Sequence, residues 1–184
     1  MMPRMPVRSP AQRLQRVLHL ARLDALSLVA VAAPAAVVSL FGRDWFAATV
    51  GAGVALCGGL EWTGRRRLEH RLLSGLGWMC AAQLGCLVFI LLYAWNLAHQ
   101  VQADRIVALL PSFTREQLDE LFPDPGSLQA LLLGLQRLMA AALAIASIVY
   151  QGGMALYYLR ARRVAQLVFA EPPVLADAPP PLPR

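Results

Sequence analysis

Polar side chains that could carry out chemistry are rare within the long apolar stretches of this 184-residue chain. Two amides stand out. Gln83 lies 12 residues after Arg71 and Gln151 lies 9 residues before Arg160, which on helices places them about 18 Å and 13 Å from one boundary of the apolar region. We expect a hydrogen bond between these amides that contributes about 1 kcal/mol and fixes the relative rotation of two helices. The functional alternative is a substrate or ion site at that depth.

The remaining residues form no recognisable catalytic or cofactor-binding pattern. Glu61 borders an apolar stretch and is expected to form an i,i+4 ion pair with Arg65. No carboxylate is expected deep inside an early helix, where proton-coupled exporters of this size place one. The sequence contains no zinc-protease motif, nucleotide-binding loop or GxSxG motif. Haem ligation is not expected either, because the histidines do not fall on facing helices: His19, His70 and His99.

Composition predicts the elements that carry these residues. Apolar residues make up 58% of the chain and charged residues 15%, compared with about 45–50% and about 25% in soluble domains. The charges leave four apolar stretches, each near or above the length needed to cross a bilayer core of about 30 Å. We therefore predict an all-α integral membrane protein with a four-transmembrane-helix bundle. The predicted spans cover residues 24–42, 45–62, 72–98 and 137–159.

Three further segments accompany the predicted transmembrane domain, which covers residues 24–159. Residues 1–23 are expected to form a cytoplasmic, basic, amphipathic helix. Residues 99–136 are expected to form an external segment that contains a short acidic helix. Residues 160–184 continue the last helix into the cytoplasm and end in a proline-rich tail, whose composition cannot pack a core.

The distribution of arginine predicts how the chain crosses the membrane. All 17 basic residues are arginine, and alternate segments carry 13 and 4 of them. Because cytoplasmic segments are enriched in basic residues, both termini are expected in the cytoplasm. The bias toward arginine, alanine and leucine is typical of a GC-rich bacterial genome, which favours a bacterial inner (plasma) membrane. The net charge of +6 is thus explained by topology, and no nucleic acid partner is expected.

Small and basic residues predict how the helices contact lipid and one another. Anionic lipid headgroups are expected to contact the arginines at the cytoplasmic side, namely Arg13, Arg16, Arg22, Arg65, Arg66 and Arg67. Helices in lipid associate closely where small side chains recur at four-residue spacing. The second and third spans carry such stripes, which we expect in the bundle interior: Gly51, Ala55, Gly59, Gly77, Ala81 and Gly85.

These patterns favour a non-enzymatic function. A membrane enzyme would gather titratable groups into one site, and the sequence does not predict such a gathering. We therefore expect no cofactor and no metal, and an interaction or scaffold protein whose partner is a second copy of the chain or another membrane protein. The alternative is a small transporter or channel subunit with a path near Gln83 and Gln151.

Overall fold

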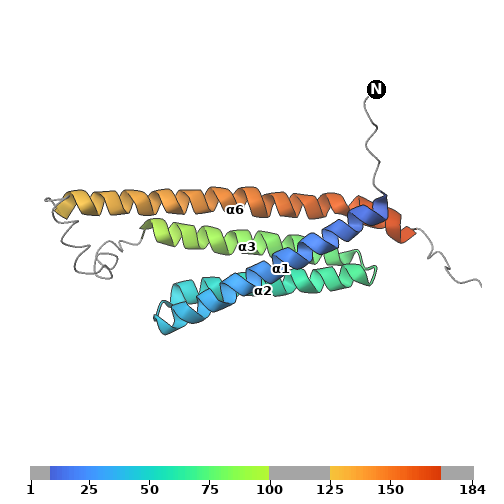
Figure 1. The fold of residues 1–184 in the computed structure, drawn as a ribbon, viewed down its shortest axis with the longest axis horizontal. Helices are drawn as coiled ribbons and strands as arrows, with labels where there is room; N and C mark the ends of the chain where they lie inside the picture. Colours follow the sequence, from blue (N-terminus) through green and yellow to red (C-terminus); the bar gives the residue numbers. More distant parts are fainter. Residues whose placement is uncertain (1–8, 100–124, 171–184) are drawn as a thin grey trace, which may run out of the picture.

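The computed structural model describes residues 9–99 and 125–170, and within them every regular element is an α-helix (Figure 1). The helices are α1 (Pro10–Phe41), α2 (Trp45–Glu69), α3 (Ser74–His99) and α6 (Pro125–Ala170). The all-helical fold class expected from the sequence is therefore confirmed. The short acidic helix predicted before residue 125 and the proline-rich tail lie outside the described residues.

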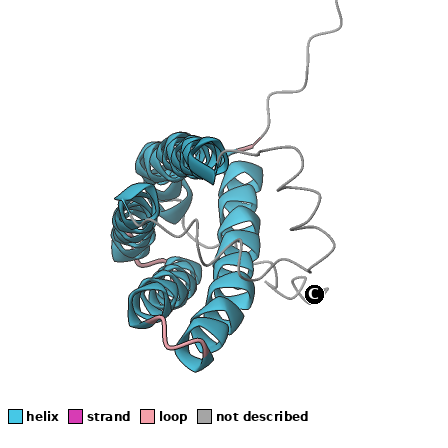
Figure 2. Cartoon of the chain, turned by 90° about the vertical axis from the view of Figure 1, so that its left-hand side faces the viewer, coloured by secondary structure: helices cyan, strands magenta, loops and turns pink. Residues whose placement is uncertain are grey.

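The four helices form an antiparallel bundle in which each helix packs mainly against two others. Both α1 and α3 contact α2 and α6. Figure 2 looks along the bundle and shows the helices arranged around a common centre. α1 and α3 therefore face each other across one diagonal, and α2 and α6 face each other across the other. An inward side chain near the middle of one helix can reach all three others.

Short connections fix the first three helices as antiparallel neighbours. Ser9 caps the start of α1 and Asp44 caps the start of α2, each by accepting a hydrogen bond from a backbone amide three residues later. The turn between α1 and α2 has three residues, and the turn between α2 and α3 has four. Each turn contains one arginine in the left-handed conformation, Arg43 with φ 58° and Arg71 with φ 60°. The sequence predicted the first of these hairpins, since so few residues permit no other arrangement.

The helices extend beyond the predicted spans. α1 is continuous from Pro10, so the basic segment assigned to residues 1–23 runs into the first span without a break after residue 23. α2 continues to Glu69, which places residues 65–67 on a helix instead of a loop. α6 begins 12 residues before the predicted fourth span and has 46 residues. At 1.5 Å per residue it is about 69 Å long, roughly twice the thickness of a bilayer core.

Three of the helices are long and apolar enough to cross a membrane, namely α1, α3 and residues Gly126–Ala170 of α6. α2 is not among them, although a span was predicted over residues 45–62. Its five glycines add no apolar side chain and Glu61 is acidic, so the mean hydropathy of α2 is lower. Four of these glycines have a packing role, because α2 lies against both α1 and α3 and a Cβ atom at each of the four would meet a neighbouring helix.

Two separate clusters of buried apolar residues fill the bundle. Along each of the first three helices, the stretch between the two clusters contains a buried polar residue. The cluster nearer the chain termini contains Leu14, Val17, Ala21, Leu68, Leu76, Met79, Tyr158, Ala161 and Ala165. The second cluster contains Ala32, Val50, Val54, Cys57 and Cys86. Asp24 on α1, Glu61 on α2 and Gln83 on α3 each occupy the gap between these clusters along their helix. The centre of the bundle is therefore polar.

Only some members of the predicted small-residue stripes bring helices together. A Cβ atom on Gly51 would lie 3.0 Å from the Cβ of Ala36, and one on Gly85 would lie 3.1 Å from the Sγ of Cys57. Ala55 is half-buried. The other three members do not lie in the bundle interior, where we expected them, but are exposed on the surface of the single chain: Gly59, Gly77 and Ala81.

The tightest glycine contact joins α2 to α3 and lies outside those stripes. A Cβ atom on Gly64 would lie 2.7 Å from the carbonyl oxygen of Gly75. A Cβ atom on Gly75 would meet the carbonyl of Gly64 and would lie 2.8 Å from the amide nitrogen of Leu68. Both obstructions are backbone atoms, which cannot rotate away. The two helices can approach this closely only because neither position carries a side chain.

We therefore expect Gly75→Ala to lower the free energy of unfolding by about 1–3 kcal/mol, because the added methyl group must push two backbones apart. Gly77→Ala is the matched control, since nothing lies within 4 Å of a Cβ atom at Gly77. Because alanine has a higher helix propensity than glycine, Gly77→Ala should leave the free energy of unfolding unchanged or raise it by up to about 1 kcal/mol. Thermal unfolding of the purified chain in detergent measures both, and equal effects would contradict the Gly64–Gly75 contact.

Candidate functional site

Two carboxyl groups from different helices are buried at the centre of the bundle. Asp24 on α1 is 5% exposed and Glu61 on α2 is 0% exposed. Asp24 lies 14 residues from the first residue of α1, or about 21 Å along the helix. The expectation that no carboxylate would lie deep inside an early helix is therefore wrong. We call Asp24 and Glu61 the carboxyl pair.

Glu61 does not form the ion pair that was predicted with Arg65. Arg65 instead donates from Nη2 to Oε1 of Glu69 at 2.6 Å, and its guanidinium lies 4.9 Å from the centre of the Trp62 ring. Arg65 has an acidic residue four positions away on either side, and both spacings allow an ion pair. Glu61 points inward because the bundle offers it two uncharged hydrogen-bond donors, Gln83 and Tyr158.

One amide group bridges the carboxyl pair. The Nε2 of Gln83 on α3 donates to Oδ2 of Asp24 and, at 2.9 Å, to Oε2 of Glu61. Gln83 is itself 0% exposed. Hydrogen bonds to charged acceptors are stronger than those between neutral groups, and they are stronger still away from water. The bridge therefore holds three helices in one relative rotation.

Two tyrosines on α6 supply the other donors. The hydroxyl of Tyr150 donates to Oδ1 of Asp24 at 2.8 Å, and the hydroxyl of Tyr158 donates to Oε1 of Glu61. Each of the four carboxyl oxygens thus accepts one hydrogen bond. Tyr158 is fully buried, whereas Tyr150 is 52% exposed. Asp24, Glu61, Gln83, Tyr150 and Tyr158 together form what we call the polar cluster, which draws on all four helices.

Gln151 lies beside the polar cluster but does not bond to Gln83 as predicted. It is buried, and its Nε2 donates to the Sγ of Cys86 at 3.4 Å. The N–H groups of Gln83 go to the carboxyl pair because ionisable oxygens are better acceptors than an amide oxygen. As a result, the Oε1 atoms of both Gln83 and Gln151 are buried without a hydrogen-bond partner among the described residues.

The helical register contains a signal that would have identified Asp24. Leu14, Val17 and Ala21 recur at three- and four-residue spacing on the apolar face of α1, and Asp24 continues the same face. An aspartate in line with buried apolar residues indicates a buried carboxyl group. Glu61 carries the same signal between Cys57 and later buried positions of α2.

A cavity of about 370 Å³ lies between α3 and α6 beside the polar cluster. Its wall includes Ser74 at the start of α3, Arg162 near the end of α6, and Tyr158. Gly77 also lines it, which explains the open space around that glycine. Tyr158 therefore contacts both the cavity and Glu61.

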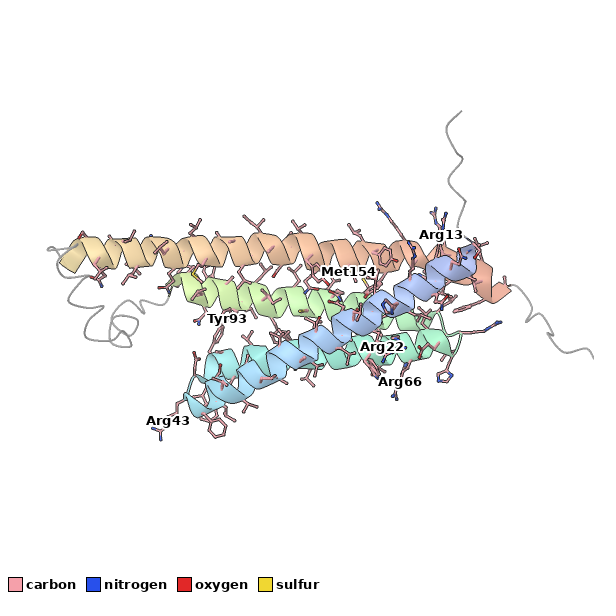
Figure 3. The ribbon with its side chains drawn as sticks, viewed as in Figure 1. Arg13, Arg22, Arg43, Arg66, Tyr93 and Met154 are labelled. Carbon is pink, nitrogen blue, oxygen red and sulfur yellow. The ribbon has the colours of Figure 1, made fainter. Side chains whose placement is uncertain are left out.

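Basic and aromatic residues gather at the end of the bundle where this cavity lies. Figure 3 places Arg13, Arg22 and Arg66 toward this end and Arg43 at the opposite end. Arg66 lies 5.7 Å from the centre of the Trp62 ring, which Arg65 also covers. Tryptophan beside arginine is typical of the boundary between membrane and water.

The residues that the structure describes contain no group of three or more histidine, cysteine, aspartate or glutamate side chains arranged to hold a metal ion. The carboxyl pair supplies two such side chains. The nearby cysteines are free, with Cys57 and Cys86 buried and Cys80 half-buried. The reactive groups at the centre of the bundle are therefore the two carboxyl groups and their uncharged hydrogen-bond donors.

Removal of one donor should test whether the carboxyl pair depends on α6. We expect Tyr158→Phe to lower the free energy of unfolding by about 1–3 kcal/mol, because Glu61 stays buried and loses a hydrogen bond. Tyr157→Phe is the matched control, since Tyr157 is half-buried and its ring contacts Tyr158. Denaturant or thermal unfolding in detergent measures both, and a similarly small loss in the two variants would count against the Tyr158–Glu61 bond.

Comparison of the chain with protein-family models, with curated proteins and with solved structures found no match. The contacts within the bundle therefore carry the functional argument. Of these contacts, the ones made by the carboxyl pair are the most unusual for a helical bundle, because charged side chains are almost never fully buried unless they are paired.

Proposed function

We propose that the chain is a small transporter or channel subunit of a bacterial inner membrane, with the polar cluster as its working site. The observation that carries this proposal is the carboxyl pair, which is buried on two separate helices. Within the described residues, neither Asp24 nor Glu61 forms an ion pair with a basic side chain. Ionisable residues inside a membrane domain usually mark a path for ions, protons or substrate.

A purely structural function would not require this arrangement. Removing charged groups from water costs several kcal/mol per ion, and neutral hydrogen bonds or apolar packing can hold helices together without that cost. The amide of Gln83 could bond to a neutral partner and fix the same helix rotation. Two carboxyl groups in contact with one amide are therefore better explained by a function that uses their charge.

The outer surface of the bundle supports its placement in a membrane. Three helices are long and apolar enough to cross one. α2 exposes Leu56 and Leu60 on its outer face, as a helix in contact with lipid would. The turns that join α2 to α1 and to α3 have only three and four residues, so α2 must cross the membrane beside these two helices. We therefore propose four spans, with anionic headgroups around the basic end.

Topology mapping should place the basic end of the bundle in the cytoplasm. Reporter fusions at residue 1 and at residue 184 are both expected to report a cytoplasmic position, and a fusion within residues 100–124 is expected to report an external one. Expression in a bacterial host, followed by reporter activity on each side, measures this. An external N-terminus would contradict the proposed orientation, and opposite termini would contradict four spans.

Reconstitution into liposomes tests the transport proposal directly. A potassium diffusion potential is imposed, and a pH-sensitive dye and a sodium-sensitive dye inside the vesicles report ion entry. The wild-type chain should carry at least one of these ions faster than empty liposomes do. Gln83→Leu should remove that excess because it breaks the bridge to the carboxyl pair. Gln15→Leu, at an exposed position of α1, is the matched control and should retain it.

A second candidate function is that of a non-enzymatic interaction or scaffold protein. It is favoured by the exposed small residues of α2 and α3, Gly59, Gly77 and Ala81, which would permit close approach of another helix. The closed packing around Gln83 and Gln151 also agrees with it. Wild-type flux equal to that of empty liposomes would remove the transport proposal and leave this one.

A further inference from the structure

We propose that Asp24 and Glu61 together bind a single exchangeable proton. This inference rests on the proposed function and names the ion that its site would take. It concerns binding alone, so it can be tested on the purified chain without any measurement of flux.

The carboxyl pair has donors but no counter-charge. Its four oxygens accept bonds from the amide of Gln83 and the hydroxyls of Tyr150 and Tyr158, all of which are uncharged. Oδ2 of Asp24 and Oε2 of Glu61 accept from the same nitrogen, Nε2 of Gln83, so the two carboxyl groups lie close together. Two ionised carboxylates at such a separation repel strongly when water is excluded, and a shared proton removes the repulsion.

Two buried acceptors nearby show that the site lacks a hydrogen-bond donor. The Oε1 of Gln83, which belongs to the amide that bridges the pair, has no partner among the described residues, and neither has the Oε1 of Gln151. Both side chains are more than nine-tenths buried. An unpartnered buried acceptor costs about 1–3 kcal/mol. One added proton supplies a donor within the cluster and allows the hydrogen bonds to rearrange around it.

A proton fits the centre better than a metal ion does. Any cation shared by the two carboxyl groups would have to lie between them, where the N–H groups of Gln83 point. An N–H group repels a metal ion, and Oδ1 of Asp24 and Oε1 of Glu61 are already occupied by hydroxyl donors. A proton needs only the oxygens themselves.

The surrounding titratable groups leave the carboxyl pair as the natural site for proton exchange. They are Cys57 on α2, Cys86 on α3, and Tyr150 and Tyr158 on α6, in addition to the pair itself on α1 and α2. Thiols and phenols are ordinarily neutral at pH 7. The carboxyl groups are therefore the only strong acids among these groups, and an exchangeable proton would be held by the pair.

The cluster reaches the bundle surface through one of its tyrosines and borders a cavity through the other. Tyr158 is fully buried and lies in the wall of the cavity between α3 and α6, together with Ser74 and Arg162. Tyr150 bonds to Asp24 from a position that is half exposed on α6. The two hydroxyls therefore reach the carboxyl pair from different points along α6, eight residues apart.

Infrared spectroscopy of the full chain in lipid nanodiscs tests the inference. A protonated carboxyl group has a carbonyl absorption that is separate from that of carboxylates and amides. We expect this band in the wild-type chain at neutral pH, with an intensity of one group per chain, and its loss at alkaline pH. Asp24→Asn or Glu61→Gln should remove it, whereas Asp44→Asn, at the exposed cap of α2, should not.

Several results would overturn the inference. One is the absence of the band from the wild-type chain at neutral pH, which needs no variant to fold. A second is a band unchanged in both Asp24→Asn and Glu61→Gln. A third is its loss when sodium chloride replaces choline chloride at constant pH, which would assign the site to a metal ion. Tyr158→Phe gives a further check, since it keeps both carboxyl groups and should shift the band without removing it.

The outcome is separable from that of the flux measurement. A band with no flux above empty liposomes would leave the proton site standing and remove the transport function. Sodium flux without a band would leave the transport function standing and remove the proton site. The two experiments together therefore decide between a proton-binding helical bundle that transports nothing and one that moves ions.

Discussion

The hydrogen bonds between the amide of Gln83 and the carboxyl groups of Asp24 and Glu61 constrain the whole bundle. A buried carboxyl group must keep its donors, because an unsatisfied one costs more than any single packing contact contributes. Since the donor and the two acceptors lie on three helices, none of these helices can rotate without breaking a bond. The fourth helix is tied to the same point by its tyrosines.

The features that the sequence predicted correctly are those set by local patterns. Long apolar stretches separated by charges predict helices, and a connection as short as Gly42–Asp44 predicts a hairpin. The burial of Gln83 and Gln151 was also predictable, because polar side chains within long apolar stretches face the interior of a bundle. These properties need no knowledge of which helices become neighbours.

The features that could not be predicted depend on the direction in which a side chain faces. Asp24 stands at the edge of a charge-free stretch, so counting charges along the chain treats it as a boundary, although its helix begins 14 residues earlier. Arg65 has two acidic candidates at the same spacing, and only the packing of α2 decides that it pairs with Glu69. Gly59 and Gly64 are both glycines of α2, yet of these two only Gly64 meets another backbone.

The connections between helices divide the polar cluster into two parts. Asp24, Glu61 and Gln83 lie on three helices joined by turns of three and four residues, so their mutual positions are fixed by the covalent chain as well as by packing. Tyr150 and Tyr158 lie on α6, which follows α3 only after 25 further residues. A displacement of α6 alone would therefore withdraw both hydroxyls and leave the amide bridge in place. Two of the three donors to the carboxyl pair are thus held in place by packing alone, whereas the third is also held by short covalent connections.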